Sequence, residues 1–423
     1  MSDFLAAERL TVRPVRAPLR GRAVPPGSKS ITNRVLLLAA LANGTSRITG
    51  ALRSDDTRHM ATALRAMGVP VEETGATSFE ITGNGHLQPP SDPLFLGNAG
   101  TATRFLAAIA ASVDGTVVVD GDEHMRKRPI APLVEALRAW GVAIEAPSGC
   151  PPVTIRGTGR LPAGRVTIDG GLSSQYVSAL LMAAPLAEGP VDIVLTGDQI
   201  GARGYVDLTI AAMEAFGAGA EEVSAGHWRV SPTGYMPANH HVEPDASAAT
   251  YLWAAERLTG GAIDIGTAPD AFTQPDAKAH DLIALFPRMP AVIDGAQMQD
   301  AVPTLAVLAA CNEKPVRFVG IENLRVKECD RIAALSQGLN RIRPGLAAEE
   351  GDDLVVHADP TLRGATVSAE IDTFADHRIA MSFALAGLVT DGLTILDPGC
   401  VAKTFPAYWD VLAGLGVELR PAG

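Results

Sequence analysis

The chain alternates six times between a helix rich in small apolar residues and a short aliphatic strand that ends near a glycine. Each predicted helix begins with polar, charged or glycine residues, in the segments 27–34 (GSKSITNR), 98–104 (NAGTATR), 173–178 (SSQYVS), 245–250 (DASAAT), 300–304 (DAVPT) and 376–381 (DHRIAM). The strands that follow are predicted at 46–50, 116–121, 191–197, 262–266, 316–320 and 394–399. The pattern predicts six related α/β units.

The spacing of the units excludes a common solenoid. The glycines that close the six strands, at positions 50, 121, 197, 266, 320 and 399, are separated by 71, 76, 69, 54 and 79 residues. Solenoid repeats run to about 20–50 residues. A second pattern, an amphipathic helix end followed by glycine and a strand, recurs in 64–73, 137–146, 213–222 and 412–420. Since glycine commonly ends a helix, each unit has at least two helices and several strands.

A polar, proline-rich segment divides the six units into two groups of three. The segment is 232–244 (PTGYMPANHHVEP), and we expect it to be a linker. Two lobes of three units each are the natural arrangement, and ligand sites prefer the cleft between such lobes.

Composition narrows the class of ligand. The 423 residues carry a formal net charge of −12, which argues against nucleic acid and anionic membranes as partners. The four cysteines form no CxxC pair or zinc pattern, and we expect Cys311 to lie in the core. The N-terminal segment lacks the apolar core of a signal peptide, and no apolar run is long enough to span a membrane. We expect a cytoplasmic protein.

The helix starts are candidate anion sites. Free N–H groups and the helix dipole favour anions there, and Lys29, Arg34, Arg104 and Arg378 add positive charge at three of the six starts. Each start taken alone is equally well explained as an ordinary capped helix. The segment 27–34 is not a Walker A loop, because Ser28 separates Gly27 from Lys29.

Two further segments carry charged residues in unusual patterns. In 323–331 (NLRVKECDR), Lys327 and Glu328 stand side by side, as in an acid–base pair, although a surface helix start with local ion pairs fits as well. The basic cluster 125–129 (MRKRP) taken alone is typical of a solvated helix start. No nucleophile elbow or paired-histidine metal motif is present. The residues therefore indicate proton transfer and anion binding without a metal or covalent nucleophile.

Taken together and in order, the motifs resemble the EPSP synthase family, and the resemblance covers essentially the whole chain. The matching segments are GSKSITNR, LGNAGTATR, RPI, SSQ, NLRVKECDR, DHR and AKTFP. The resemblance implies the enolpyruvyl transferase fold, a two-lobed inside-out α/β barrel with three βαβαββ repeats in each lobe. It implies one lobe of residues 1–23 plus 243–423, a second of 24–242, and an active site between them.

The resemblance also implies a reaction and its residues. The enolpyruvyl group of phosphoenolpyruvate is transferred to the 5-hydroxyl of shikimate 3-phosphate through a tetrahedral intermediate, phosphate is released, and no cofactor or metal is needed. The implied catalytic residues are Asp300 as base, Glu328 as acid and Lys29. The residues implied to bind shikimate 3-phosphate are Lys29, Ser30, Arg34, Ser173, Ser174, Gln175, Asp300, Asn323 and Lys327. Those implied to bind phosphoenolpyruvate are Lys29, Asn98, Gly100, Arg128, Gln175, Arg331, Arg378 and Lys403.

Two positions depart from the family pattern. Ala202 stands where a serine is usual, so a contact to shikimate 3-phosphate is missing unless backbone or Arg203 replaces it. Phe105 stands where a proline is common. Gly100 is retained, so we expect glyphosate to inhibit the enzyme. We also expect the enzyme to be a monomer.

The alternatives are a related activity and a loss of activity. UDP-N-acetylglucosamine enolpyruvyl transferases have the same fold and donor, but they carry a reactive cysteine in the loop corresponding to 120–128, which has none here. A non-catalytic anion-binding scaffold is the other alternative, and the retained Glu328, Asp300, Lys29 and Lys403 argue against it.

Overall fold

The computed structural model describes residues 3–197 and 201–422. These residues form two compact units. Unit 1 combines Met1–Pro26 with Pro244–Gly423, and unit 2 is the continuous segment Gly27–Glu243. Within the described residues, no helix is long and apolar enough to cross a membrane.

The six helices predicted from the small apolar residues are confirmed, and they form the centre of each unit. They are α2 (Lys29–Leu41), α4 (Gly100–Ile109) and α6 (Ser174–Ala183) in unit 2, and α8 (Ala246–Thr259), α10 (Val302–Ala309) and α12 (His377–Gly387) in unit 1. Nearly every residue in them is buried, as expected for a helix that is apolar on all sides. In unit 2, α4 contacts α2 and α6, and in unit 1 the three central helices contact one another.

A second set of helices lies outside the central ones and has exposed faces. These helices are α3 (Asp55–Ala66), α5 (Ala131–Ala139) and α7 (Gly204–Ala215) in unit 2, and α1 (Asp3–Ala6), α9 (Ala279–Ala284), α11 (Arg331–Ile342) and α13 (Tyr408–Gly414) in unit 1. The helix–glycine–strand pattern predicted the C-terminal ends of α3, α5, α7 and α13, and each is followed by a strand. Cys311 is buried just beyond α10, as predicted.

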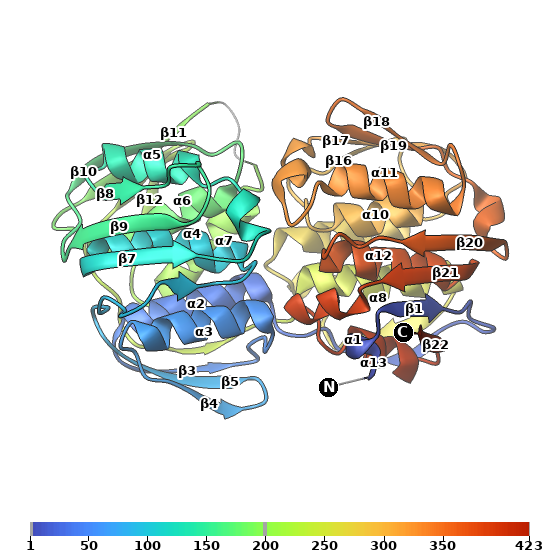
Figure 1. Cartoon of the computed structure of the whole chain (residues 1–423), viewed down its shortest axis with the longest axis horizontal. Coiled ribbons are helices and arrows are strands. Elements are labelled where there is room, and N and C mark those ends of the chain that lie inside the picture. Colours follow the sequence, from blue (N-terminus) through green and yellow to red (C-terminus); the bar gives the residue numbers. More distant parts are fainter. Residues whose placement is uncertain (1–2, 198–200, 423) are drawn as a thin grey trace. The chain divides into compact units, whose positions relative to one another are not determined.

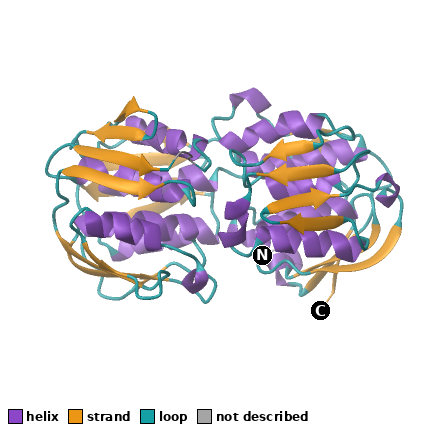
Figure 2. Ribbon diagram, turned by 90° about the horizontal axis from the view of Figure 1, so that it is seen from above, coloured by secondary structure: helices purple, strands orange, loops and turns teal. Residues whose placement is uncertain are grey.

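The sheets lie outside the helices of their own unit (Figure 1; Figure 2). Five have one topology, in which a parallel pair is followed by two antiparallel strands. In unit 2 they are β14-β3-β5-β4 (Asn239–His241, Asn43–Thr49, Ser78–Asn84, Val71–Gly75), β6-β7-β9-β8 (Leu94–Phe95, Asp114–Asp120, Val153–Thr158, Ala143–Glu145) and β10-β11-β13-β12 (Gly164–Asp169, Val191–Thr196, His227–Val230, Ala220–Ser224). In unit 1 they are β16-β17-β19-β18 (Val292–Asp294, Val316–Val319, Asp353–Val356, Ala347–Glu350) and β20-β21-β1-β22 (Thr366–Ile371, Asp391–Leu396, Arg9–Val12, Leu419–Ala422).

The segment 232–244 is more than a linker, and that prediction is corrected. It contains β14, which pairs in parallel with β3 and completes the first sheet of unit 2. The pairing is satisfied by backbone groups, such as the Arg47 N–H that donates to the Ala238 carbonyl at 3.1 Å. The polar sequence concealed this strand because its side chains stay largely exposed.

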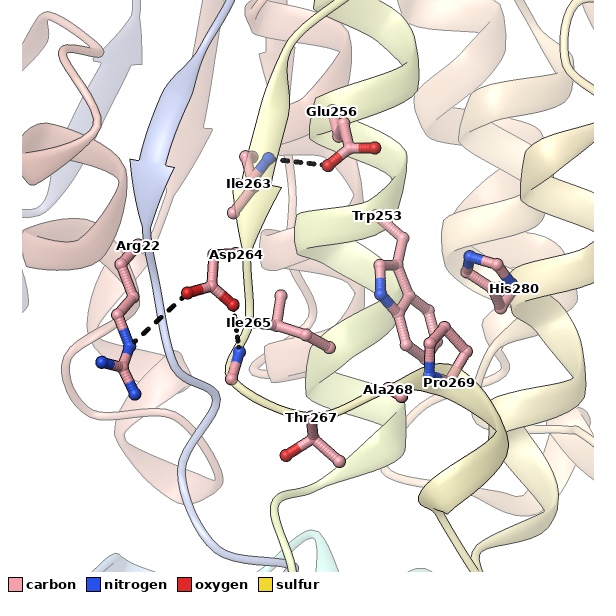
Figure 3. A pocket seen from close by; sticks show the side chains of 11 residues that line it. Arg22, Trp253, Glu256, Ile263, Asp264, Ile265, Thr267, Ala268, Pro269 and His280 are labelled. Atoms are coloured by element: carbon pink, nitrogen blue, oxygen red, sulfur yellow. Dashed lines mark hydrogen bonds and ion pairs between the residues drawn. The ribbon is translucent and has the colours of Figure 1, made fainter.

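The sixth sheet has only two strands, β2 (Arg20–Arg22) and β15 (Ala262–Asp264). Among the described residues of this unit, no antiparallel pair of strands extends the β2–β15 pair, which accounts for the short spacing of 54 residues before the next closing glycine. The Glu256 carboxylate accepts a hydrogen bond from the Ile263 N–H at 2.7 Å and so occupies part of the open strand edge. Beside this edge lies a pocket of about 580 Å³. Figure 3 shows the residues that line it, with Arg22 and Asp264 on one side and Trp253 and His280 on the other.

Candidate active site

Polar residues gather in each unit at the starts of the central helices. The starts are fixed by capping side chains: Ser28 accepts from the Ile31 N–H, Ser173 from the Gln175 N–H, and Asp376 from the Arg378 N–H. The central helices are otherwise largely apolar, and the polar side chains of their first turns lie at their N-terminal ends. The result is one polar cluster in each unit.

The cluster in unit 1 is organised around Arg331, whose side chain is only 1% exposed. Its guanidinium donates to three carboxylates: to Asp376 through Nε at 2.8 Å, to Asp300 through Nη1 at 3.0 Å, and to Glu328 through Nη2 at 2.8 Å. Burial lowers the pKa of Arg331, but the carboxylates of Asp376, Glu328 and Asp300 raise it more, so the net shift is upward. Arg331 is therefore a permanent positive charge.

Two more cations complete this cluster. Arg378 donates to Asp300 Oδ2 at 2.8 Å, and Lys403 donates to Glu328 Oε1 at 2.6 Å. Burial lowers the pKa of Arg378, but Asp300, Tyr251, Asp245 and Asp276 together raise it more, so the net shift is upward, as for Arg331. The structure thus brings Asp300, Glu328, Arg331, Arg378 and Lys403 into one network, with Asp376 as the third carboxylate.

This network can bind an anion and move a proton. Its three cations are balanced by three carboxylates, and the guanidinium of Arg331 links all three carboxylates. An arriving anion competes with Glu328 for Arg331 and Lys403. The loss of positive charge around a carboxylate increases its affinity for a proton. Anion binding can therefore prepare Glu328 to act as an acid.

Asn323 and Lys327 lie on the segment that precedes Arg331. Lys327 Nζ donates to Gln299 Oε1 at 3.3 Å, beside Asp300 in the sequence. Asn323 is buried, and its Oδ1 accepts no hydrogen bond from the described residues. The segment is a 3₁₀ turn (Glu322–Val326) followed by α11, which begins at Arg331. Because Arg331 is buried, the alternative of a solvated surface helix start is wrong for this residue.

In unit 2, α2 carries Lys29, Ser30 and Arg34. The side chain of Lys29 is 11% exposed and lies 4.0 Å from Asp56 Oδ2. Arg34 is buried and donates to the Thr209 hydroxyl at 2.7 Å and the Ser30 carbonyl at 2.8 Å, with weaker bonds to the Ser178 hydroxyl and the Tyr205 carbonyl. All four acceptors are neutral, and burial lowers the pKa of Arg34 to about 10.

The loop before α4 brings Asn98, Gly100 and Arg128 together. Arg128 Nη1 donates to Asn98 Oδ1 at 3.0 Å. Arg104 Nη1 donates to the Gly100 carbonyl at 3.0 Å. A Cβ on Gly100 would lie 2.7 Å from Arg104 Nη1 and 2.8 Å from both terminal nitrogens of Arg128, so only glycine leaves both guanidiniums in place.

The basic cluster 125–129 divides between surface and site. Arg126 pairs with Asp120 at 2.6 Å with its side chain 56% exposed, whereas Arg128 is buried beside the loop before α4. The prediction of a solvated helix start holds for Arg126 and for Lys127, which is also exposed, and fails for Arg128.

The start of α6 lies beside the same loop. Gln175 Nε2 donates to the Thr101 hydroxyl at 3.4 Å, which places Gln175 next to α4. Ser174 is buried, and Ser173 is partly exposed and caps α6. These contacts join the predicted residues of α4 and α6 in one cluster.

The two departures from the family pattern have structural counterparts. Ala202 is buried, and its φ of +56° is a left-handed conformation that residues other than glycine rarely adopt. Arg203 forms ion pairs with Asp207 at 3.0 Å and Glu222 at 2.7 Å. Phe105 is fully buried under the Arg34 guanidinium, 5.0 Å from its ring centre.

Sequence reasoning missed Asp376 as a site residue. This carboxylate is fully buried, holds Arg331 and caps α12. An aspartate directly before an apolar helix has the signature of a helix cap, and no nearby residue indicates its contact with Arg331. Within residues 3–197 and 201–422, no group of three or more His, Cys, Asp or Glu side chains is placed to hold a metal ion.

Comparison with known proteins agrees with this geometry. Residues 15–412 match the family model described as EPSP synthase (3-phosphoshikimate 1-carboxyvinyltransferase). A protein of that name from Rhizobium leguminosarum bv. trifolii is 72% identical over 412 residues, covering 97% of this chain and 98% of the relative. Another, from Pseudomonas savastanoi pv. phaseolicola, is 67% identical over 411 residues, covering 97% and 98%.

Solved structures give the fold. The EPSP synthase of Acinetobacter baumannii matches with a TM-score of 0.78 at 25% identity, covering 98% of this chain and all of that one. The enolpyruvyl transferase NikO of Streptomyces tendae has the same fold, with a TM-score of 0.72 at 19% identity over 99% of this chain and 100% of that one. The predicted enolpyruvyl transferase fold is confirmed, and the chain belongs to the EPSP synthase family.

Proposed function

We propose that the chain transfers the enolpyruvyl group of phosphoenolpyruvate to the 5-hydroxyl of shikimate 3-phosphate, releasing phosphate. The relatives that match over nearly the full chain carry the corresponding name. The observation that carries the proposal is the network of three cations and three carboxylates in unit 1, which combines anion binding with an acid. The UDP-N-acetylglucosamine activity is not favoured by these relatives.

In this proposal unit 1 supplies the acid, the base and part of the donor site. Arg331, Arg378 and Lys403 bind phosphoenolpyruvate, and Glu328 protonates its methylene carbon. Asp300 takes the proton of the 5-hydroxyl as that oxygen attacks the enol carbon. Asn323 and Lys327 bind the acceptor. General acid–base catalysis of this kind contributes about 10²–10⁴-fold per group.

Unit 2 supplies the remaining contacts. Lys29 touches both substrates, and Ser30, Arg34, Ser173, Ser174 and Gln175 hold the acceptor. Asn98, Gly100, Arg128 and Gln175 hold phosphoenolpyruvate. Arg34 supports this assignment. The four described groups that accept its hydrogen bonds are all neutral, so the anionic substrate shikimate 3-phosphate would supply the counter-charge of the guanidinium. The reaction requires both units, because each holds residues for each substrate.

The decisive test is phosphate release from phosphoenolpyruvate with two alternative acceptors. Turnover with shikimate 3-phosphate and none with UDP-N-acetylglucosamine is the expected result. Turnover with the nucleotide sugar would place the chain with the sister activity. Tight binding of shikimate 3-phosphate without turnover would instead support the anion-binding scaffold.

We expect Gly100→Ala to raise the KM for phosphoenolpyruvate by about 10–100-fold, because displacing a binding group by about 1 Å can cost that much. The added Cβ forces away the guanidinium of Arg128 and crowds that of Arg104. Initial-rate kinetics with both substrates varied will check this. The Kd for shikimate 3-phosphate should stay unchanged, and an equal loss for both substrates would contradict the assignment of Gly100.

Glyphosate inhibition, oligomeric state and location complete the proposal. An intact Gly100 predicts inhibition below millimolar glyphosate, and a flat curve to that concentration would refute it. Gly100→Ala should weaken the inhibition together with donor binding. We propose a cytoplasmic monomer, so sedimentation should give a single species near 44.0 kDa.

A further inference from the structure

A buried carboxylate beneath Lys29 has no assigned role in the reaction. Asp56 lies in the first turn of α3, and its side chain is 1% exposed. The adjacent Asp55 has the opposite environment, since its side chain is 52% exposed and pairs with Arg58 at 2.7 Å. A carboxylate is rarely withdrawn from water without a partner, because desolvation costs several kcal/mol.

The partners of Asp56 come from α2. Its Oδ2 lies 3.5 Å from Asn33 Nδ2 and 4.0 Å from Lys29 Nζ, and its Oδ1 accepts no hydrogen bond from the described residues. Asn33 lies one turn after Lys29 and also donates to the Lys29 carbonyl at 3.3 Å. The N-terminus of α3 adds favourable dipole charge, but the ammonium of Lys29 is the full positive charge beside Asp56.

We propose that Asp56 is a positioning residue that holds the Lys29 ammonium aimed toward the substrates. The inference rests on the proposed function, in which Lys29 touches both anionic substrates. A lysine side chain is flexible, and fixing it costs conformational entropy. A fixed counter-charge offsets part of this cost before the substrates arrive. Because the Lys29 ammonium lies 4.0 Å from Asp56 Oδ2, it is held loosely enough to move between the carboxylate and the substrates.

The other ionisable groups on the packed elements are engaged elsewhere. On α3, His59 lies one turn from Asp56, and burial lowers its pKa more than Asp56 raises it, so it is neutral near pH 7. Arg34 on α2 and Arg104 on α4 donate to the neutral groups described above. On β4, Glu73 pairs with Arg53 and Arg65. Among the described residues, the cation that faces Asp56 is therefore Lys29.

The test compares Asp56→Asn with Asp55→Asn, which makes the same charge change one residue away. Without the carboxylate, the Lys29 ammonium loses a counter-charge that orients it toward the substrates. Asp56→Asn should lower kcat by about 10-fold and raise the KM for both substrates, because Lys29 touches both. Asp56→Glu should restore both parameters, since it keeps the charge. Asp55→Asn should leave both unchanged.

Unchanged kcat and KM values in a folded Asp56→Asn variant would overturn the proposal, as would equal effects of the two asparagine variants. If Asp56→Asn does not fold, Lys29→Met tests the pairing through stability. We expect Lys29→Met to lower the free energy of unfolding, because Asp56 then stays buried without the ammonium beside it. The matched control is Lys127→Met at an exposed lysine. No loss relative to that control would also overturn the pairing.

The two proposals fail in different ways. Absence of turnover by the wild-type chain would reject the proposed function. The unfolding experiment on Lys29→Met does not depend on turnover, so it still reports whether Asp56 pairs with Lys29.

Discussion

Glu328→Gln is expected to lower kcat by about 10²–10⁴-fold, the usual contribution of a general acid. Glutamine keeps the shape of the side chain, but its amide is too weak an acid to donate a proton to carbon. The wild-type carboxylate is placed for the role, because Lys403 contacts one oxygen at 2.6 Å and Arg331 the other at 2.8 Å. Phosphoenolpyruvate would draw both cations away and increase the proton affinity of Glu328 as the donor arrives. Phosphate release at saturating substrates measures the effect.

Glu322→Gln is the matched control for this prediction. Glu322 is exposed and opens the same segment, so it tests the charge change without touching the network. Its kcat should be that of the wild type. The Kd for shikimate 3-phosphate, measured by calorimetry, should change little in either variant. A kcat for Glu328→Gln within a few-fold of wild type would mean that another group donates the proton.

Arg331→Met is expected to lower the free energy of unfolding by about 3–5 kcal/mol, as when one partner of a buried ion pair is removed. The variant leaves Asp376, Glu328 and Asp300 without the guanidinium that joins them. The loss should shrink in acid, where these carboxylates take up protons and no longer repel one another. Chemical denaturation at several pH values measures both the size and the pH dependence of the effect.

Arg325→Met offers a closely matched comparison. Arg325 also contacts three carboxylates, those of Asp330, Glu349 and Asp352, but its side chain is 27% exposed. Water can solvate the carboxylates that it would leave behind, so the expected loss is about 1 kcal/mol. Equal losses in the two variants would show that burial does not set the value of the Arg331 network.

Hydrophobic patterning predicted the helices well because burial of the central helices imposes an unbroken apolar sequence. The start of α2 at Lys29 and of α12 at His377 followed from polar residues that cap an apolar run. The pairing of strands could not be read in this way. The strand β14 joins β3 across roughly 190 residues of sequence, and nothing local to its residues encodes that partner.

The site was predictable as a set of residue types and much less as a network. Lys403 and Glu328 were expected to serve one substrate, and the structure joins them directly. The buried Asp376, which organises Arg331, and Asp56, which lies behind Lys29, were absent from the predicted site. Both depend on contacts between helices distant in sequence, and a carboxylate near a helix start has the same local signature whether it caps, pairs or faces water.

The position of β1 sets an order of folding during synthesis. This strand lies between β21 and β22, with Leu10 opposite Ile395 on one side and Pro421 on the other. The N-terminal strand must therefore wait until residues 419–422 have left the ribosome before its sheet can close. Unit 2 is continuous from Gly27 to Glu243, so all of it is synthesised before residues 244–423 of unit 1. Translation from the N-terminus thus completes unit 2 first, while Leu10 and Val12, fully buried in the finished molecule, stay exposed to solvent or chaperones.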